Sequence, residues 1–114
     1  MSLETTLQTL LNALAAGGAH QDIARQGATA PYLVWLLVAS PTNNSLQGAS
    51  NVQNTRIQVD CYAASQAARQ TLADVVVAAM AASSLSNVRL SSQNLYEPEV
   101  KLFRTMLEFS IWST

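Results

Sequence analysis

The hydrophobic period of the chain changes within residues 55–81, and this change restricts the possible folds more than any other feature. In the stretch "TRIQVDCYA", Ile57, Val59 and Cys61 alternate with polar residues, which is the period of two of a strand with one covered face. From residue 64 onward the apolar residues recur at helical spacing instead. A strand that runs directly into a helix predicts an α+β domain, in which the helix packs on the apolar face of a sheet.

Two helices are expected. The second covers residues 64–81, with Ser65 as its N-cap and a run of serines after its end. Its apolar face is formed by Ala68, Leu72, Val75, Val76, Ala79 and Met80. The first helix has Ser2 as a plausible N-cap and ends at Gly17-Gly18. Its apolar stripe is formed by Leu3, Leu7, Leu10, Leu11 and Leu14.

Three further strands are expected. The continuous apolar run 32–39, "YLVWLLVA", predicts a strand that is covered on both faces or that continues into an interface. A short strand is predicted at 88–90 and a long one at 102–113, whose residues alternate between apolar and mostly polar. We expect residues 91–101 to form a turn or loop because they contain Asn94 and Pro98. A short extended piece is allowed around Ile23.

The predicted order is α-β-β-α-β-β in a single domain, 1–114. The economical packing is one antiparallel sheet of about four strands with both helices on one face, and a long hairpin loop at 41–54. The other sheet face would then show polar and aromatic side chains, which is the composition of an interface rather than a core. These side chains are Gln58, Asp60, Tyr62, Arg104, Met106, Glu108 and Trp112.

The charge content of the chain favours self-assembly. Charged residues make up 11% of the sequence, against roughly 25% in an average soluble domain. Lys101 is the only lysine, and interfaces are poor in lysine, glutamate and aspartate. The net charge of −1 and the scattered arginines argue against a nucleic-acid groove. No apolar run approaches the roughly 20 residues that span a bilayer, the first residues do not predict a signal peptide, and one cysteine suits a reducing cytosol.

The connector 41–54, "PTNNSLQGASNVQN", is uncharged and much longer than the usual connection of about 4–6 residues. Because it also contains apolar residues, we expect it to order against a neighbouring subunit or another protein. Its candidate interface residues are Asn43, Asn44, Leu46, Gln47, Asn51, Val52 and Gln53. Those on the sheet are Arg56, Asp60, Tyr62, Arg104, Glu108 and Trp112. The spacings Arg56 to Asp60 and Arg104 to Glu108 allow a ladder of charges across that face.

No catalytic set, cofactor site or metal site is predicted. His20 is the only histidine, so a site with several histidine ligands is excluded. A His20–Cys61 nucleophilic dyad is conceivable, but Cys61 lies on the apolar side of its strand and is better explained as a small buried hydrophobe. Glu97 and Glu99 could imitate an acid–base pair, but as loop residues without polar companions they are expected to be solvated.

Three segments, 30–40, 55–80 and 95–114, carry a family resemblance. The second contains the pattern R-x-Q-[VI]-D-x-Y, matched by Arg56, Gln58, Val59, Asp60 and Tyr62. The third contains [LI]-Y-[DE]-P-[ED], matched at residues 95–99, and closes on [DE]-F-S-[IV]-W, matched at 108–112. In this order the segments resemble the tail-completion or tail-terminator proteins of long-tailed bacteriophages and related gene-transfer particles.

The resemblance implies a structural virion protein rather than an enzyme. It would form a hexameric ring on the head-proximal end of the tail tube, stop tube polymerisation, and offer a joining surface to the head connector or neck protein. DNA would pass through its lumen without specific binding, no membrane would be involved, and assembly would take place in the host cytoplasm. The alternatives are another neck or head-completion component, or a small oligomeric α+β enzyme or ligand-binding domain that uses His20, Cys61 or Glu97 and Glu99.

Overall fold

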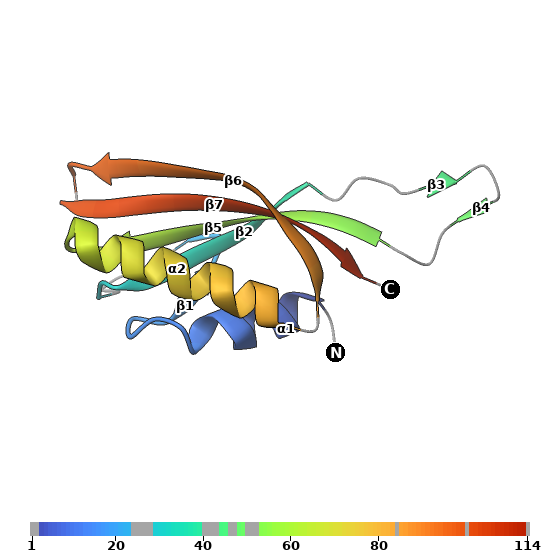
Figure 1. Cartoon of the computed structure of the whole chain (residues 1–114), viewed down its shortest axis with the longest axis horizontal. Coiled ribbons are helices and arrows are strands. Elements are labelled where there is room, and N and C mark those ends of the chain that lie inside the picture. The colour runs from blue at the N-terminus through green and yellow to red at the C-terminus, as the bar shows by residue number, and fades with distance from the viewer. Residues whose placement is uncertain are drawn as a thin grey trace.

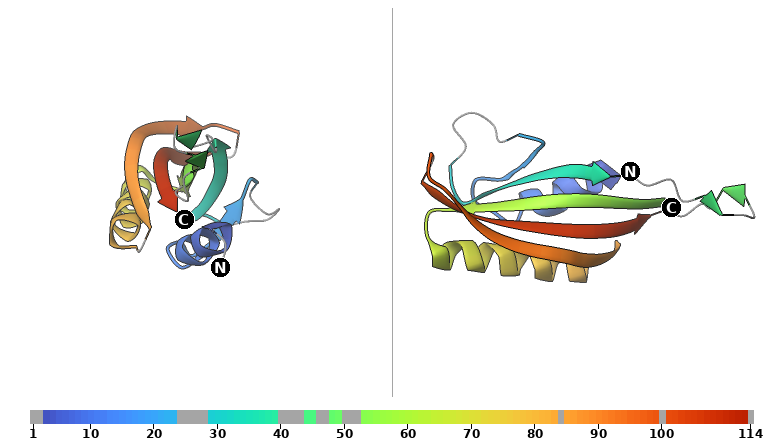
Figure 2. Two further views of the ribbon diagram at one scale, coloured as in Figure 1. Left: turned by 90° about the vertical axis from the view of Figure 1, so that its right-hand side faces the viewer. Right: turned by 90° about the horizontal axis from the view of Figure 1, so that it is seen from above.

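A computed structural model of the chain describes residues 3–23, 29–39, 44–45, 48–49, 53–83, 85–99 and 101–113. The elements in chain order are α1 (Leu3–Asn12), β1 (Ala19–Gln21), β2 (Tyr32–Ala39), β3 (Asn44–Ser45), β4 (Gly48–Ala49), β5 (Gln53–Ala63), α2 (Gln66–Ala82), β6 (Ser86–Glu97) and β7 (Leu102–Ser113). Five strands form one sheet in the order β1-β2-β5-β7-β6. Both helices pack on the same face of this sheet, as predicted (Figure 1, Figure 2).

The prediction of an antiparallel sheet of about four strands in the order α-β-β-α-β-β was partly wrong, because the sheet is mixed and has a fifth strand, β1, between α1 and β2. β1 pairs in parallel with β2, whereas the other neighbours are antiparallel. A strand of three residues is too short to show a period, and it lies before Ile23 rather than around it. Two glycines bring it there. A Cβ on Gly17 would lie 2.0 Å from the carbonyl oxygen of Thr29, and Gly18 has a φ of +80°, so the chain reverses directly after α1.

β6 is much longer than the strand predicted at 88–90. It spans twelve residues, Ser86–Glu97, so most of the stretch 91–101 that was predicted as a loop is strand, and only its end forms a turn. The sequence misled because β6 is an edge strand whose side chains are nearly all exposed. Polar residues on both sides remove the alternation on which strand prediction depends. The register nevertheless pairs Ser91 to Glu97 with β7 without interruption, after an irregularity between Arg89 and Ser91.

The core lies between the helices and the sheet. The sheet contributes Leu33, Trp35, Ile57, Val59, Cys61, Leu107, Phe109 and Ile111. The helices contribute Leu7, Leu11, Leu72, Ala73, Val76 and Met80. The predicted face of α2 was therefore partly wrong, since Ala68 is exposed and Val75 is 38% exposed. The prediction of the N-cap is confirmed, because Ser65 Oγ accepts a hydrogen bond from the Ala68 amide at 3.1 Å. The predicted cap of α1, Ser2, lies outside the described residues.

Gln8 fixes α1 against the sheet. Its side-chain amide donates to the carbonyl oxygen of Ala19 at 2.8 Å and accepts from the indole Nε1 of Trp35, also at 2.8 Å. The indole of Trp35 is fully buried, and a buried N–H needs such an acceptor. One glutamine thus joins the first helix to β1 and β2.

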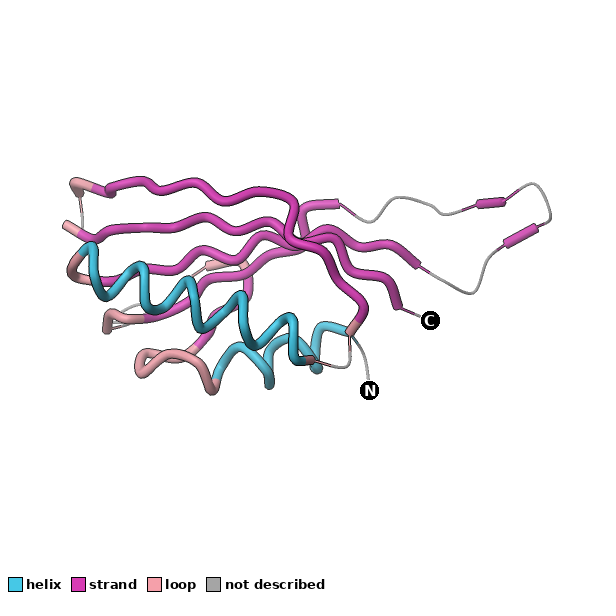
Figure 3. Tube along the Cα trace, in the orientation of Figure 1, coloured by secondary structure: helices cyan, strands magenta, loops and turns pink. Residues whose placement is uncertain are grey.

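The connector between β2 and β5 joins two antiparallel strands, as predicted for a hairpin. Within it, β3 and β4 pair antiparallel, with Asn44 opposite Ala49 and Ser45 opposite Gly48. These two short strands lie beyond one end of the five-stranded sheet (Figure 3). The other connector residues up to 52 lie outside the described part of the chain. In that described part, no helix combines the length and the apolar character needed to span a bilayer.

Candidate functional site

The pleat of β5 and β7 gives the sheet a second face that no described helix covers (Figure 2). We call it the outer face. At its centre it is formed by Tyr32, Val34, Leu36, Gln58, Asp60, Tyr62, Arg104, Met106 and Glu108, which share one side of β2, β5 and β7 by register. Asp60 and Val34 are buried even though no helix of the described part of the chain covers this face. Neighbouring side chains of the outer face therefore shield these two residues from water.

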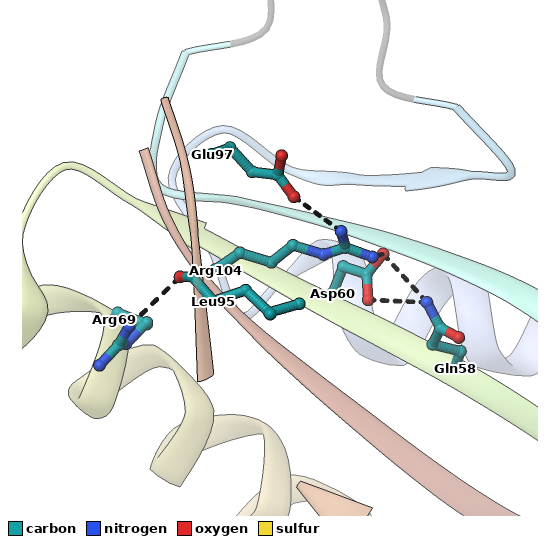
Figure 4. A network of polar contacts seen from close by, with 6 residues as sticks. All are labelled: Gln58, Asp60, Arg69, Leu95, Glu97 and Arg104. Atoms are coloured by element: carbon teal, nitrogen blue, oxygen red, sulfur yellow. Dashed lines mark hydrogen bonds and ion pairs between the residues drawn. The ribbon is translucent and has the colours of Figure 1, made fainter. Parts of the chain in front are cut away.

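Arg104 lies at the centre of a polar network on this face (Figure 4). Its Nη2 donates to Asp60 Oδ2 at 2.9 Å and its Nη1 to Glu97 Oε1 at 2.8 Å. Gln58 Nε2 donates to Asp60 Oδ1 at 3.0 Å. The network ties together β5, β7 and the end of β6.

The predicted ladder of charges is half correct. Asp60 and Arg104 do meet, but the second carboxylate is Glu97 rather than Glu108. Arg56 is exposed and takes part in neither of the ion pairs found among the described residues. The expectation that Glu97 is a solvated loop acid was wrong, because β6 extends far enough to place it beside Arg104.

The two charges at the centre of the network are in different electrostatic situations. Burial raises the pKa of Asp60 above its ordinary value, and this outweighs the opposing effects of Arg104 and Gln58. Burial alone would lower the pKa of Arg104, but the hydrogen bond to Glu97 and the charge of Asp60 raise it instead. Arg104 therefore stays protonated and is shared by two carboxylates, one of them deeply buried.

A hollow of about 340 Å³ lies next to this network. It is lined by Asp22, Ile23, Tyr32, Val34, Leu36, Asp60, Tyr62, Glu97 and Glu99. The rings of Tyr32 and Tyr62 stack with centroids 4.9 Å apart and an angle of 18° between their planes. The guanidinium carbon of Arg104 is 5.8 Å from the centroid of the Tyr62 ring. The hollow thus combines carboxylates with an aromatic wall.

The His20–Cys61 dyad that the sequence left conceivable does not form. Register places His20 beside Val34 and Asp60 on the outer face, whereas Cys61 lies beside Leu33 on the helix face. Cys61 is fully buried, and burial raises the pKa of its thiol to about 12, so the prediction of a buried hydrophobe is confirmed. In the described residues, no group of three or more His, Cys, Asp or Glu is placed to hold a metal ion.

The remaining predicted interface residues lie toward the other end of the outer face or in the connector. Trp112 is 39% exposed, close in register to Val88, which is 52% exposed. Glu108 is half-buried opposite Gln58. Asn44 and Gln53 lie in strands, but their side chains are not described. Asn43, Leu46, Gln47, Asn51 and Val52 lie outside the described residues.

Tyr32, Glu97 and Glu99 were not predicted as interface residues. The three segments that carry the family resemblance could have indicated them, because each of these segments contributes residues to the hollow. Tyr32 comes from 30–40, Asp60 and Tyr62 come from 55–80, and the two glutamates come from 95–114. Segments that are distant in sequence therefore meet at one place on the outer face.

A model of the family described as Tail completion protein gp17 matches residues 6–114, which is nearly the whole chain. No curated protein matches the chain.

Proposed function

Because the chain belongs to the tail completion protein gp17 family, we propose that it forms a hexameric ring on the head-proximal end of a bacteriophage tail tube. There it stops tube polymerisation and presents the surface to which the head connector joins. The family itself is one of structural tail proteins, so the chain has a tail-completion role and its place is the tail of the virion.

The outer face is the observation that carries this proposal. In the residues that the structure describes, one sheet face has no covering layer, and this face holds an arginine shared between two carboxylates and a pair of stacked tyrosines. Arginine and tyrosine are the residues that interfaces favour. A face that is already packed and hydrogen-bonded loses little side-chain entropy when a partner binds.

A ring also needs two different patches on each subunit, because its contacts are head-to-tail. The outer face supplies one patch. The connector between β2 and β5 supplies the other, since β3 and β4 lie beyond the end of the sheet and outside the two-layer body (Figure 1). DNA must pass through the proposed lumen, and a net charge of −1 is suited to passage without strong binding.

Particles assembled without the protein test the proposal. We expect filled heads and separate tails whose lengths are abnormal and widely distributed, scored by negative-stain electron microscopy. Joined particles with tails of normal length would end the proposal. Separate heads and tails of uniform, normal length would instead assign the chain to another neck component, because tube growth would then be stopped by a different protein.

A deletion of residues 43–52 tests the role of the connector. The five-stranded sheet and its core lie outside this segment, so we expect the variant to fold. We expect ring formation, measured by light scattering after gel filtration in the presence of tail tubes, to be impaired. Normal capping of tubes by the shortened protein would show that the connector is a tolerated insertion.

A further inference from the structure

Among the described residues, the hollow on the outer face has more carboxylates than the ion pairs of Arg104 balance. Four carboxylates line it, those of Asp22, Asp60, Glu97 and Glu99. Arg104 pairs with Asp60 and Glu97. The other two carboxylates form no ion pair within the described residues, and both residues are exposed at the rim.

The wall of the hollow is suited to a cation on an apolar stem. Tyr32 and Tyr62, whose rings stack on each other, both line the hollow, and aromatic rings attract guanidinium and ammonium groups. Val34 and Leu36 supply apolar surface beside them. A lysine or arginine side chain has this combination of an alkyl stem and a charged head.

Arg104 shows how this surface already holds a guanidinium. Its head group lies between two carboxylates and 5.8 Å from the Tyr62 ring. Asp22 and Glu99 are exposed and line the same hollow as Tyr32, so they offer a second cation the same kind of carboxylate and aromatic groups. The volume of about 340 Å³ is at the lower end of the range of about 300–1,000 Å³ for small ligand sites, so it admits a side chain rather than a folded element.

We propose that this hollow receives a lysine or arginine side chain from a basic segment of a partner protein that docks on the outer face. The proposal deepens the proposed function by naming the chemistry of the joining partner. It is tested on the isolated chain, so its outcome does not depend on ring formation.

A peptide titration tests the binding. The ¹⁵N-labelled chain is titrated with acetyl-Gly-Arg-Gly-amide and, separately, with acetyl-Gly-Gln-Gly-amide, and amide shifts are followed by NMR. We expect the arginine peptide to give saturable shifts centred on Tyr32, Tyr62 and Glu99. Raising the salt from about 0.05 M to about 0.5 M should weaken binding at least threefold because exposed charges are screened. Equal binding of the glutamine peptide, or shifts spread evenly over the surface, would overturn the proposal.

A charge-neutralised variant gives the matched comparison. Asp22→Asn with Glu99→Gln removes only the two carboxylates that form no ion pair, and we expect it to bind the arginine peptide about tenfold more weakly. The control is Glu4→Gln with Asp74→Asn, which removes the same charge from exposed helix positions. Unchanged binding by the first variant, or equal weakening by the control, would refute the assignment. If the first variant fails to bind the peptide but heads and tails still join normally, the ring proposal stands and the hollow is not the joining site.

Discussion

The two faces of β5 and β7 belong to the same strands, but their side chains are buried in different ways. On the helix face, Ile57, Val59 and Phe109 are at most 1% exposed beneath two helices. On the outer face, Asp60 is only 4% exposed although no described helix covers it. On the helix face, the helices shield the side chains of the sheet from water. On the outer face, Asp60 is shielded by neighbouring side chains of the same face, such as Arg104 and Gln58.

Because of this difference, we assign stability mainly to the helix face and binding mainly to the outer face. Apolar burial is non-directional and roughly proportional to area, so the helix face supplies most of the folding free energy. A buried ion pair adds little net stability because desolvation opposes the attraction between its charges, but it fixes a particular arrangement of side chains. We therefore expect substitutions on the helix face to unfold the protein and substitutions on the outer face to change what it binds.

The largest expected effect is on the helix face. Phe109→Ala should lower the free energy of unfolding by about 3–5 kcal/mol, since it leaves a cavity in the core between the helices and the sheet. The adjacent outer-face substitution Glu108→Gln should change it by less than about 1 kcal/mol. Both are measured by urea unfolding, and Phe109→Leu replaces the alanine variant if that protein does not fold. Similar losses on the two faces would break the comparison.

The Arg104 network should give the next largest effect. Arg104→Met leaves the buried Asp60 carboxylate without its cation, so we expect a loss of about 2–4 kcal/mol. Adding Asp60→Asn should recover part of this loss because the uncompensated charge disappears. Glu97→Gln, which leaves the inner pair intact, should cost less than about 1 kcal/mol. A double variant that is less stable than Arg104→Met would show that the pair is not coupled as its geometry indicates.

A smaller effect is expected in the pH dependence of stability. The folded protein retains the Asp60 proton to a higher pH than the unfolded chain, because burial raises the pKa above the ordinary value of 3.8. The stability from this group is fully present below 3.8 and is lost as the pH rises through the raised pKa. Unfolding free energies of the natural chain and of Asp60→Asn, compared across this window, should therefore diverge. Parallel curves would contradict the raised pKa.

The sequence predicted the helix face better than the outer face, for a physical reason. Strand residues that are buried under a second layer are apolar and alternate with more polar ones, and this period of two can be recognised in the sequence. Ile57, Val59 and Cys61 were therefore placed correctly. The outer face depends on which strands are neighbours, and local sequence does not contain that information. β6 was predicted too short because both its sides face solvent, and Glu97 was therefore placed in a loop. β1 is positioned by the tight turn at Gly17 and Gly18 and by its pairing with β2. Neither feature produces a hydrophobic period in the sequence.

A modest effect on stability, and the sharpest functional test, is expected at Trp112. Its side chain is 39% exposed on the outer face, so Trp112→Ser should lower the free energy of unfolding by only about 1 kcal/mol. Exposed aromatic residues are common anchors of interfaces, so we expect the same change to reduce head–tail joining at least tenfold, scored as infectious particles. Val75→Ser is the matched control, because Val75 is 38% exposed on α2 and lies away from the outer face. If both variants join heads and tails equally well, the Trp112 end of the outer face is not a contact, and the interface is confined to the half that contains Arg104.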